Sequence, residues 1–242
     1  MCYHLSQGVQ SDRLKERYRA KNFKEQDKIK PVYHASAFSF LPWPVITNHE
    51  PDTIQAMHWG LIPAWAKSQD DAQKLRTNTL NARIETIFEK PSFREAAHKK
   101  HCLVLATGFF EWQTVGAKKY PYYIHLKDEE IFSMAGIWET WTDKKSGETR
   151  ETFSILTTEA NPLMAQIHNS KQRMPVILSK ETELNWLQKG FDETTINSFA
   201  KPFDENKMVA HTVSRFISEK YSNTPDVLKP YTYPEFMQTS LF

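Results

Sequence analysis

The strongest constraint on the fold is a long apolar run in the middle of the chain, followed by further strand-like segments on short connections. The run is His101–Trp112, with the sequence HCLVLATGFFEW, and Glu111 is its single acidic residue. Three segments with β character follow: Tyr120–Leu126, Ile131–Trp138 and Glu151–Thr158. The pieces between them (VGAK, KDEE and DKKSGE) are too short for a helical crossover and favour antiparallel pairing. The middle of the chain therefore predicts an antiparallel sheet.

Four helices are expected around this sheet. Asn161-Pro162 suits the start of a helix that runs to about His168, because Asn is a good N-cap and proline fits the first turn. The other three are expected at Asp12–Ala20 with Ser11 as cap, at Ser92–Lys100 with Ser92 as cap, and at Glu181–Lys189.

Further strands are expected at Met174–Leu178 and Met208–Val213. The segment Tyr33–Ile46 alternates loosely between apolar and polar residues. Its Pro42 and Pro44 favour an edge strand or a loop, because proline cannot donate to a hydrogen-bond ladder.

These elements together predict an α+β fold, a single domain over residues 1–242 with a curved, barrel-like, mostly antiparallel sheet flanked by helices. The sequence shows neither an internal repeat nor a low-complexity linker that would divide it. Residues 21–31 are expected to be irregular, and 219–242 are expected to form an irregular C-terminal tail.

Composition excludes several classes of function. The formal net charge is +2, so contact with a polyanion has to come from a local cluster of cations. Seven glycines and the absence of GxGxxG or GxxxxGK[ST] strings argue against a phosphate loop. Two cysteines without a CxxC pair predict neither a disulfide framework nor a metal site. Without a signal-peptide core or an apolar run of about 18 residues, a cytoplasmic location is expected.

Cys2 is the first candidate for chemistry. Removal of the initiator Met1 would expose a free α-amine and a thiol on adjacent carbons. Their ordinary pKa values, about 7.7–8.0 and about 8.5, leave both partly nucleophilic near neutral pH. The amine can condense with an aldehyde to give a Schiff base, and the thiol can then close a five-membered thiazolidine ring. Taken alone, a cysteine at this position is usually incidental.

Glu111 and His168 are candidates for proton transfer. Glu111 lies in an apolar strand, so its carboxylate either faces water on the other side or lies in a cleft with a raised pKa. His168 lies at the expected end of a helix, where the helix dipole favours the protonated ring, or where the side chain simply caps the helix.

Polar and aromatic side chains in two other segments suit a nucleic acid. Asn81 offers a donor and an acceptor, and Arg83 suits a phosphate or is merely solvated. Trp59, Pro63 and Trp65 could form a platform for unstacked bases, or pack in the core.

Taken together, these segments resemble the SRAP family, the SOS response-associated peptidase proteins. The resemblance runs in order along nearly the whole chain, and the matching strings are Met1-Cys2, WGLIPAW at 59–65, NARIE at 81–85, GFFEW at 108–112, AGIW at 135–138, TTEA at 157–160, Ile167-His168 before Arg173-Met174-Pro175, and Val213-Ser214-Arg215.

The resemblance implies a barrel-like SRAP fold and a covalent, thiazolidine-forming crosslink from Cys2 to abasic sites in single-stranded DNA. It implies that Asn81 positions the Cys2 terminus and the sugar. It implies that Glu111 moves protons during Schiff-base formation and reversal, and that His168 assists opening of the sugar ring. It also implies autoproteolytic removal of Met1 and lyase-type chemistry during the response to DNA damage.

The resemblance also implies a basic groove for the DNA strand. We expect no cofactor, no metal and no membrane contact, and we expect a monomer that acts in the cytoplasm at the nucleoid of a prokaryote. The residues expected to contact DNA are His4, Trp65, Arg83, Arg173 and Arg215.

The chain departs from the family pattern at two places. The family usually follows its cysteine with Gly-Arg, whereas this chain has Tyr3-His4, which is expected to weaken one phosphate contact or make it depend on pH. The family also usually carries an Asn-x-Ala-Pro turn, where this chain has the residues YHASAF at 33–38, so that loop is expected to be reshaped.

Two other functions remain open on the sequence alone. An N-terminal cysteine with Glu and His nearby could serve a cysteine peptidase acting on other proteins. The same residues could also belong to a binding module without catalysis. Turnover separates the first alternative from a crosslinker, because a peptidase cleaves many substrate copies whereas a crosslinker is consumed.

Overall fold

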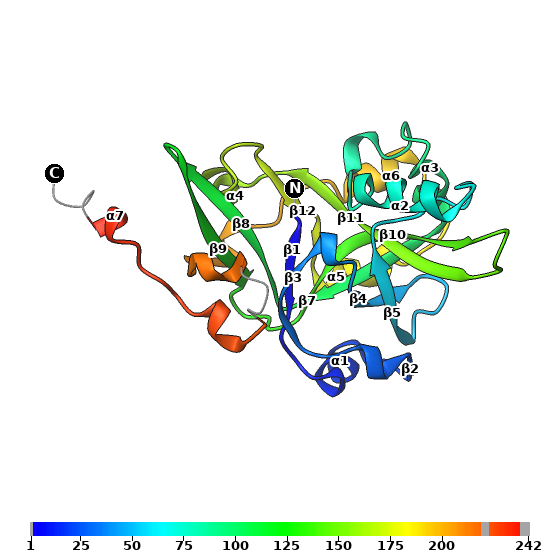
Figure 1. The fold of residues 1–242 in the computed structure, drawn as a ribbon, viewed down its shortest axis with the longest axis horizontal. Coiled ribbons are helices and arrows are strands. Elements are labelled where there is room, and N and C mark those ends of the chain that lie inside the picture. The colour runs from blue at the N-terminus through cyan, green and yellow to red at the C-terminus, as the bar shows by residue number, and fades with distance from the viewer. Residues whose placement is uncertain (1, 219–222, 238–242) are drawn as a thin grey trace.

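The computed structural model describes residues 2–218 and 223–237, and Figure 1 shows their arrangement. The strands are β1 His4–Gln7, β2 Asn22–Lys24, β3 Val32–Ser36, β4 Pro42–Thr47, β5 Thr53–Trp59, β6 Asn81–Arg83, β7 His101–Ala106, β8 Gly108–Val115, β9 Lys118–Leu126, β10 Phe132–Thr142, β11 Thr149–Glu159, β12 Arg173–Pro175, β13 Ile177–Leu178 and β14 Met208–Thr212.

Helices cover the sheets and join their ends. The α-helices are α1 Ser11–Tyr18, α2 Gln69–Asn78, α3 Arg94–Lys99, α4 Pro162–Ile167, α5 Lys180–Trp186, α6 Glu193–Ser198 and α7 Pro234–Met237. The 3-10 turns are η1 Gln26–Lys28, η2 Ala37–Ser39, η3 Ile84–Thr86, η4 Glu205–Lys207, η5 Arg215–Ser218 and η6 Pro225–Leu228.

The strands form two sheets. The first has the order β14-β9-β8-β1-β3, and the second runs β12-β11-β10-β7-β4-β5-β2. A parallel pairing of β11 with β5 closes β5, β4, β7, β10 and β11 into a five-stranded barrel. Among the strands from β7 to β11, three pairs form: β7 with β10, β8 with β9, and β10 with β11. All three are antiparallel. This confirms the predicted α+β class with a barrel-like, mostly antiparallel sheet.

The apolar run His101–Trp112 folds as two strands that meet at Thr107, and every residue of β7 is buried. Val104 belongs to one core cluster, and its neighbours Leu103 and Leu105 belong to another. A strand covered on both faces reads as a continuous apolar sequence rather than an alternating one. This explains why the run shows no period of two.

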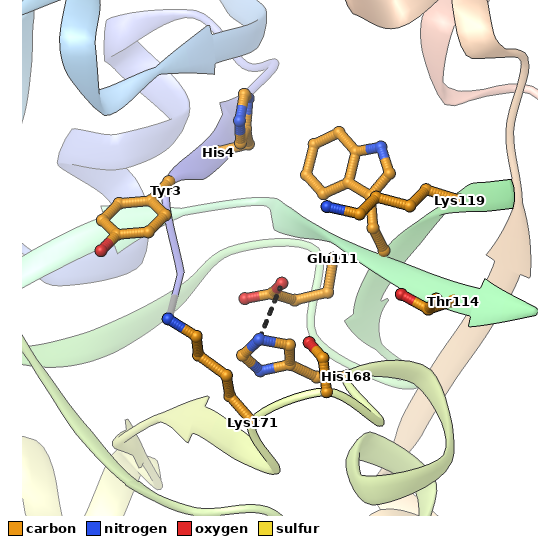
Figure 2. A pocket seen from close by; sticks show the side chains of 9 residues that line it. Tyr3, His4, Glu111, Thr114, Lys119, His168 and Lys171 are labelled. Carbon is orange, nitrogen blue, oxygen red and sulfur yellow. Dashed lines mark ion pairs between the residues drawn. The ribbon is translucent and has the colours of Figure 1, made fainter. Parts of the chain in front are cut away.

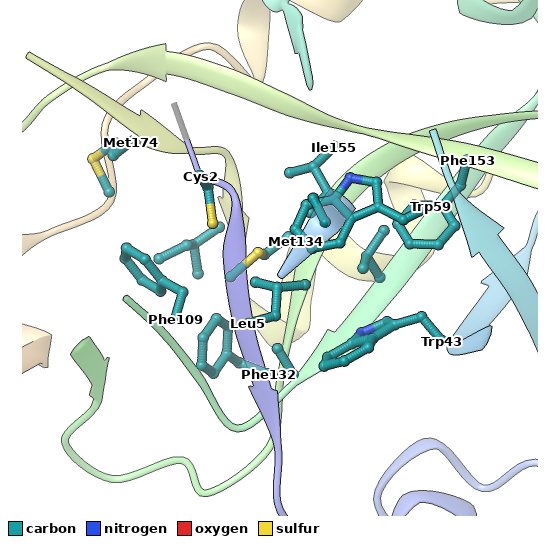
Figure 3. Close-up of a cluster of buried hydrophobic side chains, with 14 of the residues drawn as sticks. Cys2, Leu5, Trp43, Trp59, Phe109, Phe132, Met134, Phe153, Ile155 and Met174 are labelled. Atoms are coloured by element: carbon teal, nitrogen blue, oxygen red, sulfur yellow. The ribbon is translucent and has the colours of Figure 1, made fainter. Parts of the chain in front are cut away.

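The first core cluster lies where the start of the chain enters the fold. Cys2, Leu5 and Phe109 are fully buried in it, together with Trp43 and Phe132 (Figure 3). Cys2 and Leu5 therefore belong to the core, although they lie close to the start of the chain.

Helix starts differ from the sequence-based prediction at two of three expected caps. Asn161 caps α4 as predicted, because its side chain accepts a hydrogen bond from the Met164 backbone N–H. Ser11 and Ser92 do not cap: α1 begins at Ser11 after Gln10, and α3 begins after Phe93, neither with a side-chain cap. Both helices are fixed by buried faces, in α1 through Leu14, so the cap is dispensable.

Pro42 and Pro44 lie in a strand that is central in the barrel, not at an edge as predicted. The explanation is that β4 pairs with β7 only through Val45–Thr47, whereas its pairing with β5 includes both prolines. The proline half of β4 thus has a partner on one side only, which tolerates missing donors.

Residues 21–31, predicted to be irregular, contain the short strand β2 and the turn η1. The predicted strand Met174–Leu178 is divided into β12 and β13, which pair with β11 and β10 respectively. Of the predicted C-terminal tail, 223–237 contains η6 and α7, while 219–222 and 238–242 lie outside the described residues.

Gly136 gives a test of the barrel core. It lies in β10 opposite Cys102 on β7, and an added Cβ would lie 2.8 Å from the Cys102 Sγ and 3.0 Å from the Ser154 carbonyl oxygen. We expect Gly136→Ala to lower the free energy of unfolding by about 3 kcal/mol, because both neighbours are packed inside the barrel. Urea denaturation measures this change.

The control is Gly147→Ala, in the turn between β10 and β11. Nothing lies within 4 Å of its added Cβ, but its φ of +74° is unfavourable for alanine. That strain costs about 1 kcal/mol. If Gly136→Ala lowers the free energy of unfolding by no more than the control does, the site at Gly136 is not crowded.

Candidate active site

Strand β1 brings the start of the chain to the middle of the first sheet. It pairs antiparallel with β3 on one side and with β8 on the other, with His4 opposite Phe110 and Leu5 opposite Phe109. The residues that precede β1 therefore run toward the part of β8 that carries Glu111.

Cys2 is fully buried in the first core cluster. Burial raises the pKa of its thiol far above the ordinary value, and the nearby charge of Glu111 raises that pKa further. At neutral pH the side chain is thus a thiol rather than a thiolate.

Asn81 holds the backbone of Cys2. The short strand β6 pairs parallel with β11, which places Asn81 opposite Ile155. The Asn81 Nδ2 donates to the Cys2 carbonyl oxygen at 2.8 Å. The Asn81 Oδ1 is buried and accepts no hydrogen bond within the described residues, so the amide keeps an acceptor for a further donor.

Glu111 is 5% exposed on β8, between β1 and β9. Burial raises the pKa of its carboxyl to about 7, although the Trp112 backbone N–H opposes this shift. Of the two alternatives open on the sequence, the structure therefore favours the cleft with a raised pKa.

His168 follows the last turn of α4 and faces Glu111. Its Nδ1 lies 2.8 Å from the Arg173 carbonyl oxygen, which can only accept, so this nitrogen carries the proton. Its Nε2 lies 3.8 Å from the Glu111 Oε2. Burial lowers the pKa of the ring, contrary to the expected effect of a helix end, because α4 is short and the ring is 6% exposed.

A cavity of about 340 Å³ opens at this pair of side chains. Figure 2 shows Glu111 and His168 pointing toward each other in it, with Lys119 and Lys171 reaching in from two sides. Tyr3 also lines this first cavity. The cavity thus brings together Glu111 and His168, the two candidates for proton transfer, with two lysines.

The two predicted arginines near the site share one carboxylate. The Arg173 guanidinium is 7% exposed and binds both oxygens of Glu85, at 2.6 and 2.9 Å. The side chain of Arg83 is 62% exposed and lies 3.7 Å from the same Glu85. Arg83 is accessible to a ligand, whereas Arg173 fixes the carbonyl group that orients His168.

The two departures from the family pattern meet in the structure. His4 lines the first cavity, and its Nδ1 lies 2.9 Å from the Nε2 of His34, which belongs to the altered 33–38 stretch. Burial, followed by the charge of His34, lowers the pKa of His4 to about 3. Burial lowers the pKa of His34 to about 4. The pair is therefore neutral at neutral pH.

Trp65 and Arg215 lie apart from the first cavity. Trp65 is 49% exposed, and its indole N–H donates to the Pro91 carbonyl. Arg215 lines another cavity, where its guanidinium lies 4.8 Å from the ring centre of Tyr120 and 5.0 Å from that of Tyr233. Neither residue lines the cavity at Glu111.

Sequence analysis did not single out Lys119, Lys171 or Trp112. Lys171 lies in the segment between His168 and Arg173, and Lys119 is opposite Thr114 on β9. The position of Lys171 beside a candidate histidine was a usable signal. The position of Lys119 depends on the register of the β8–β9 hairpin, which the sequence alone does not specify.

In residues 2–218 and 223–237, no group of three or more His, Cys, Asp or Glu side chains is arranged to hold a metal ion. In the same ranges, no helix has the length and apolar character needed to cross a membrane.

Comparison with known proteins identifies relatives over the whole fold. The family model described as SOS response associated peptidase (SRAP) matches residues 1–220. The abasic site processing protein YoqW of Bacillus subtilis is 33% identical over 96% of this chain and 100% of its own length. The abasic site processing protein HMCES of Gallus gallus is 35% identical over 73% of this chain and 57% of its own length.

Solved structures agree with this result. A crystal structure of a protein from Bacteroides thetaiotaomicron has a TM-score of 0.90 and 44% identity, covering 96% of this chain and all of the other. One from Bordetella bronchiseptica has a TM-score of 0.75 and 25% identity, covering 88% of this chain and all of the other.

The raised pKa of Glu111 predicts a cost in stability. Between the ordinary pKa of 4.5 and about 7, the folded protein holds a proton that the unfolded chain has released. Stability therefore falls as pH rises through this window. We expect Glu111→Gln to remove this fall and to unfold with a free energy about 2–3 kcal/mol higher than wild type at pH 8.

Urea denaturation at pH 5 and pH 8 measures this difference. Glu89→Gln, at an exposed carboxylate, is the control and is expected to follow wild type at both pH values. If Glu111→Gln and wild type have the same free energy of unfolding at pH 8, then ionisation of the buried carboxyl does not destabilise the fold.

Proposed function

The chain belongs to the SRAP family, and from this membership and the geometry at Glu111 we propose that it crosslinks covalently to abasic sites in single-stranded DNA. The relatives named above are abasic site processing proteins. The observation that carries the proposal is the buried carboxyl of Glu111. It has a pKa of about 7, and it lies beside His168 and near the start of the chain. The protein would act as a monomer in the cytoplasm, at the nucleoid, in the response to DNA damage.

The first step is removal of Met1, which frees the α-amine of Cys2. The family name supports removal by the chain itself. The hydrogen bond from Asn81 to the Cys2 carbonyl keeps the new terminus in place. The acceptor that remains on Asn81 can then receive an N–H from the freed amine or a hydroxyl of the sugar.

The second step joins the amine to the opened sugar. The amine nitrogen attacks the C1′ aldehyde, and the resulting carbinolamine loses one water to give a Schiff base. Glu111, protonated below about pH 7, can donate the proton that leaves with this water. His168 carries its proton on Nδ1, so its Nε2 is the basic nitrogen that can accept the proton whose loss opens the sugar ring.

The third step closes the thiazolidine. The Cys2 sulfur adds to the carbon of the Schiff base, and its proton moves to the nitrogen, so no atom is lost. The raised pKa of the buried thiol supports this order, in which the amine attacks first. The same property disfavours a peptidase that attacks other proteins through a thiolate.

Phosphate contacts would hold the strand across the first cavity. Arg83, Lys119 and Lys171 are exposed cations near the site or on its lining. Lyase-type cleavage and crosslink reversal would proceed from the same Schiff base, with Glu111 returning the proton.

The two cysteines provide a matched test. We expect Cys2→Ala to give no adduct that survives denaturation with single-stranded DNA carrying one abasic site. Cys102→Ala, at the other buried cysteine, is expected to keep wild-type yield within about twofold, because Cys102 lies in the barrel core. A denaturing gel after incubation gives the yield.

Cys2→Ser separates the steps of the reaction. It keeps the amine but loses the thiol, so its adduct should require borohydride reduction to survive denaturation. A stable adduct from Cys2→Ala, or none from wild-type protein whose Met1 is shown by intact mass to be removed, would overturn the proposal.

Glu111 predicts a pH dependence of the crosslinking rate. Its protonated form is present below about pH 7 and is lost as pH rises. We expect Glu111→Gln to slow adduct formation about 100-fold at pH 6, since a positioned general acid typically contributes at least this factor. The ratio of wild-type to variant rates should shrink as pH rises from 6 to 8.5.

Taking the ratio removes the pH dependence that the two proteins share. Quenched time courses on a denaturing gel measure the rates. A ratio that stays constant from pH 6 to 8.5 would show that Glu111 does not act as the acid.

A further inference from the structure

A second cavity, with a volume of about 640 Å³, lies away from Glu111 and shares no lining residue with the first. Its walls come from β2, β5, α2 and β11, which lie on the opposite side of the view in Figure 1 from β8, β9 and α4. Four of its lining residues are cationic: Lys24, Lys28, Arg76 and Arg150.

Arg76, on α2, is the buried cation of this second cavity. It is 8% exposed, its Nε donates to the Trp59 carbonyl at 3.2 Å, and its guanidinium carbon lies 4.0 Å from the ring centre of Phe40. One of its terminal nitrogens, Nη2, is buried and makes no hydrogen bond within the described residues. An arginine with an unsatisfied buried donor calls for an acceptor.

The other cations of the second cavity already have acidic partners. Lys24 lies 3.0 Å from Glu151, and Lys28 lies 2.5 Å from Glu25. The third such ion pair joins Arg150 to Glu148 at 2.8 Å.

Arg76 has no such partner, since no carboxylate of the described ranges lies within ion-pair distance of it. Burial, followed by the like charge of Arg150, lowers the pKa of Arg76 to about 10. It therefore remains cationic at neutral pH, and its positive charge is balanced by no acidic side chain of the cavity.

We propose that the second cavity binds a phosphate group, with Arg76 as its main ligand and Arg150 beside it. A guanidinium presents paired donors that match phosphate oxygens, and a phosphate supplies the missing negative charge. The lysines at the mouth are held by exposed ion pairs of low stability, so they can exchange their carboxylates for the same phosphate.

Two sources can supply this phosphate: the backbone of a nucleic acid strand or free inorganic phosphate. The 37–40 segment touches residues of both cavities, so a strand that leaves the first cavity would follow this segment to reach the second. The ring centre of Tyr3, in the first cavity, lies 5.4 Å from the ring centre of the exposed Phe38. Phe40 lines the second cavity. The strand as source rests on the proposed function, whereas the phosphate site itself does not.

Arg76 also has a packing role, which limits the choice of variants. An added Cβ at Gly60 would lie 2.6 Å from the Arg76 Cγ, so the stem of the arginine is tightly packed. Arg76→Met keeps this stem and removes the donors. Arg150→Gln, on the partly exposed wall, keeps Arg76 and removes the neighbouring charge.

The first arm of the test uses inorganic phosphate and no DNA. Phosphate is titrated against sodium chloride of equal ionic strength while the NMR signals of Arg76, Phe40 and Trp59 are followed. Wild type should show a saturable shift. Arg150→Gln should weaken the apparent affinity about tenfold, as expected for loss of one charge-assisted contact, and Arg76→Met should abolish the shift.

The second arm identifies the source. Single strands of increasing length, carrying a tetrahydrofuran analogue that cannot form a Schiff base, are titrated against wild type and Arg76→Met. If added nucleotides strengthen binding to wild type but not to the variant, the phosphate comes from the strand. If longer strands strengthen binding equally in wild type and Arg76→Met, while inorganic phosphate still binds wild type, the site binds free phosphate.

The proposal is overturned if inorganic phosphate gives wild type no saturable shift, or the same shift in Arg76→Met. Where Arg76→Met does not fold, wild type and Arg150→Gln decide the outcome: equal affinities for phosphate in these two proteins overturn it. Failure of crosslinking chemistry would not affect either arm, because neither requires a reactive sugar.

Discussion

The site depends on the antiparallel pairing of β1 with its two neighbours, β3 and β8. Chain termini are commonly mobile, and a nucleophile on a mobile terminus loses orientation. Here the hydrogen bonds of β1, the burial of Leu5 and the contact from Asn81 to Cys2 fix the first residues as part of the core. The same pairing brings the start of the chain to Glu111 on β8.

A half-buried ion pair, Glu85 with Arg173, orients the candidate proton-transfer groups. Glu85 fixes the guanidinium of Arg173, and the Arg173 carbonyl oxygen accepts a hydrogen bond from the His168 Nδ1–H. The other ring nitrogen of His168, Nε2, thereby lies 3.8 Å from the Glu111 Oε2. One cause, burial, raises the pKa of the carboxyl and lowers that of the ring, so both groups tend to be uncharged near neutral pH. Such opposed shifts identify an acid and a base more firmly than either residue does alone.

The sequence predicted the fold where local pattern and tertiary structure agree. The apolar run of β7 and β8 and the short connections after it specify antiparallel strands, and Asn161 specifies the start of α4. The caps at Ser11 and Ser92 failed because buried faces, not caps, determine where those helices begin. For the site, Glu111 was recognisable as a carboxyl in an apolar strand. The approach of Asn81 to Cys2 and of Lys119 to Glu111 depends on strand register across distant segments, which local pattern does not contain.

Because the charges of the chain nearly balance, each of the two cavities presents positive charge only locally. With a net charge of +2, the chain has little long-range attraction for a polyanion. In the second cavity the acidic side chains match the surrounding cations one by one and leave only the charge of Arg76 unbalanced among the described residues that line it. In the first cavity Lys119 and Lys171 flank a carboxyl whose raised pKa keeps it largely protonated below about pH 7. The positive charge of the protein therefore attracts an anionic ligand only at short range and at defined positions. A ligand is then selected by how its charged groups fit these positions, rather than by its total charge.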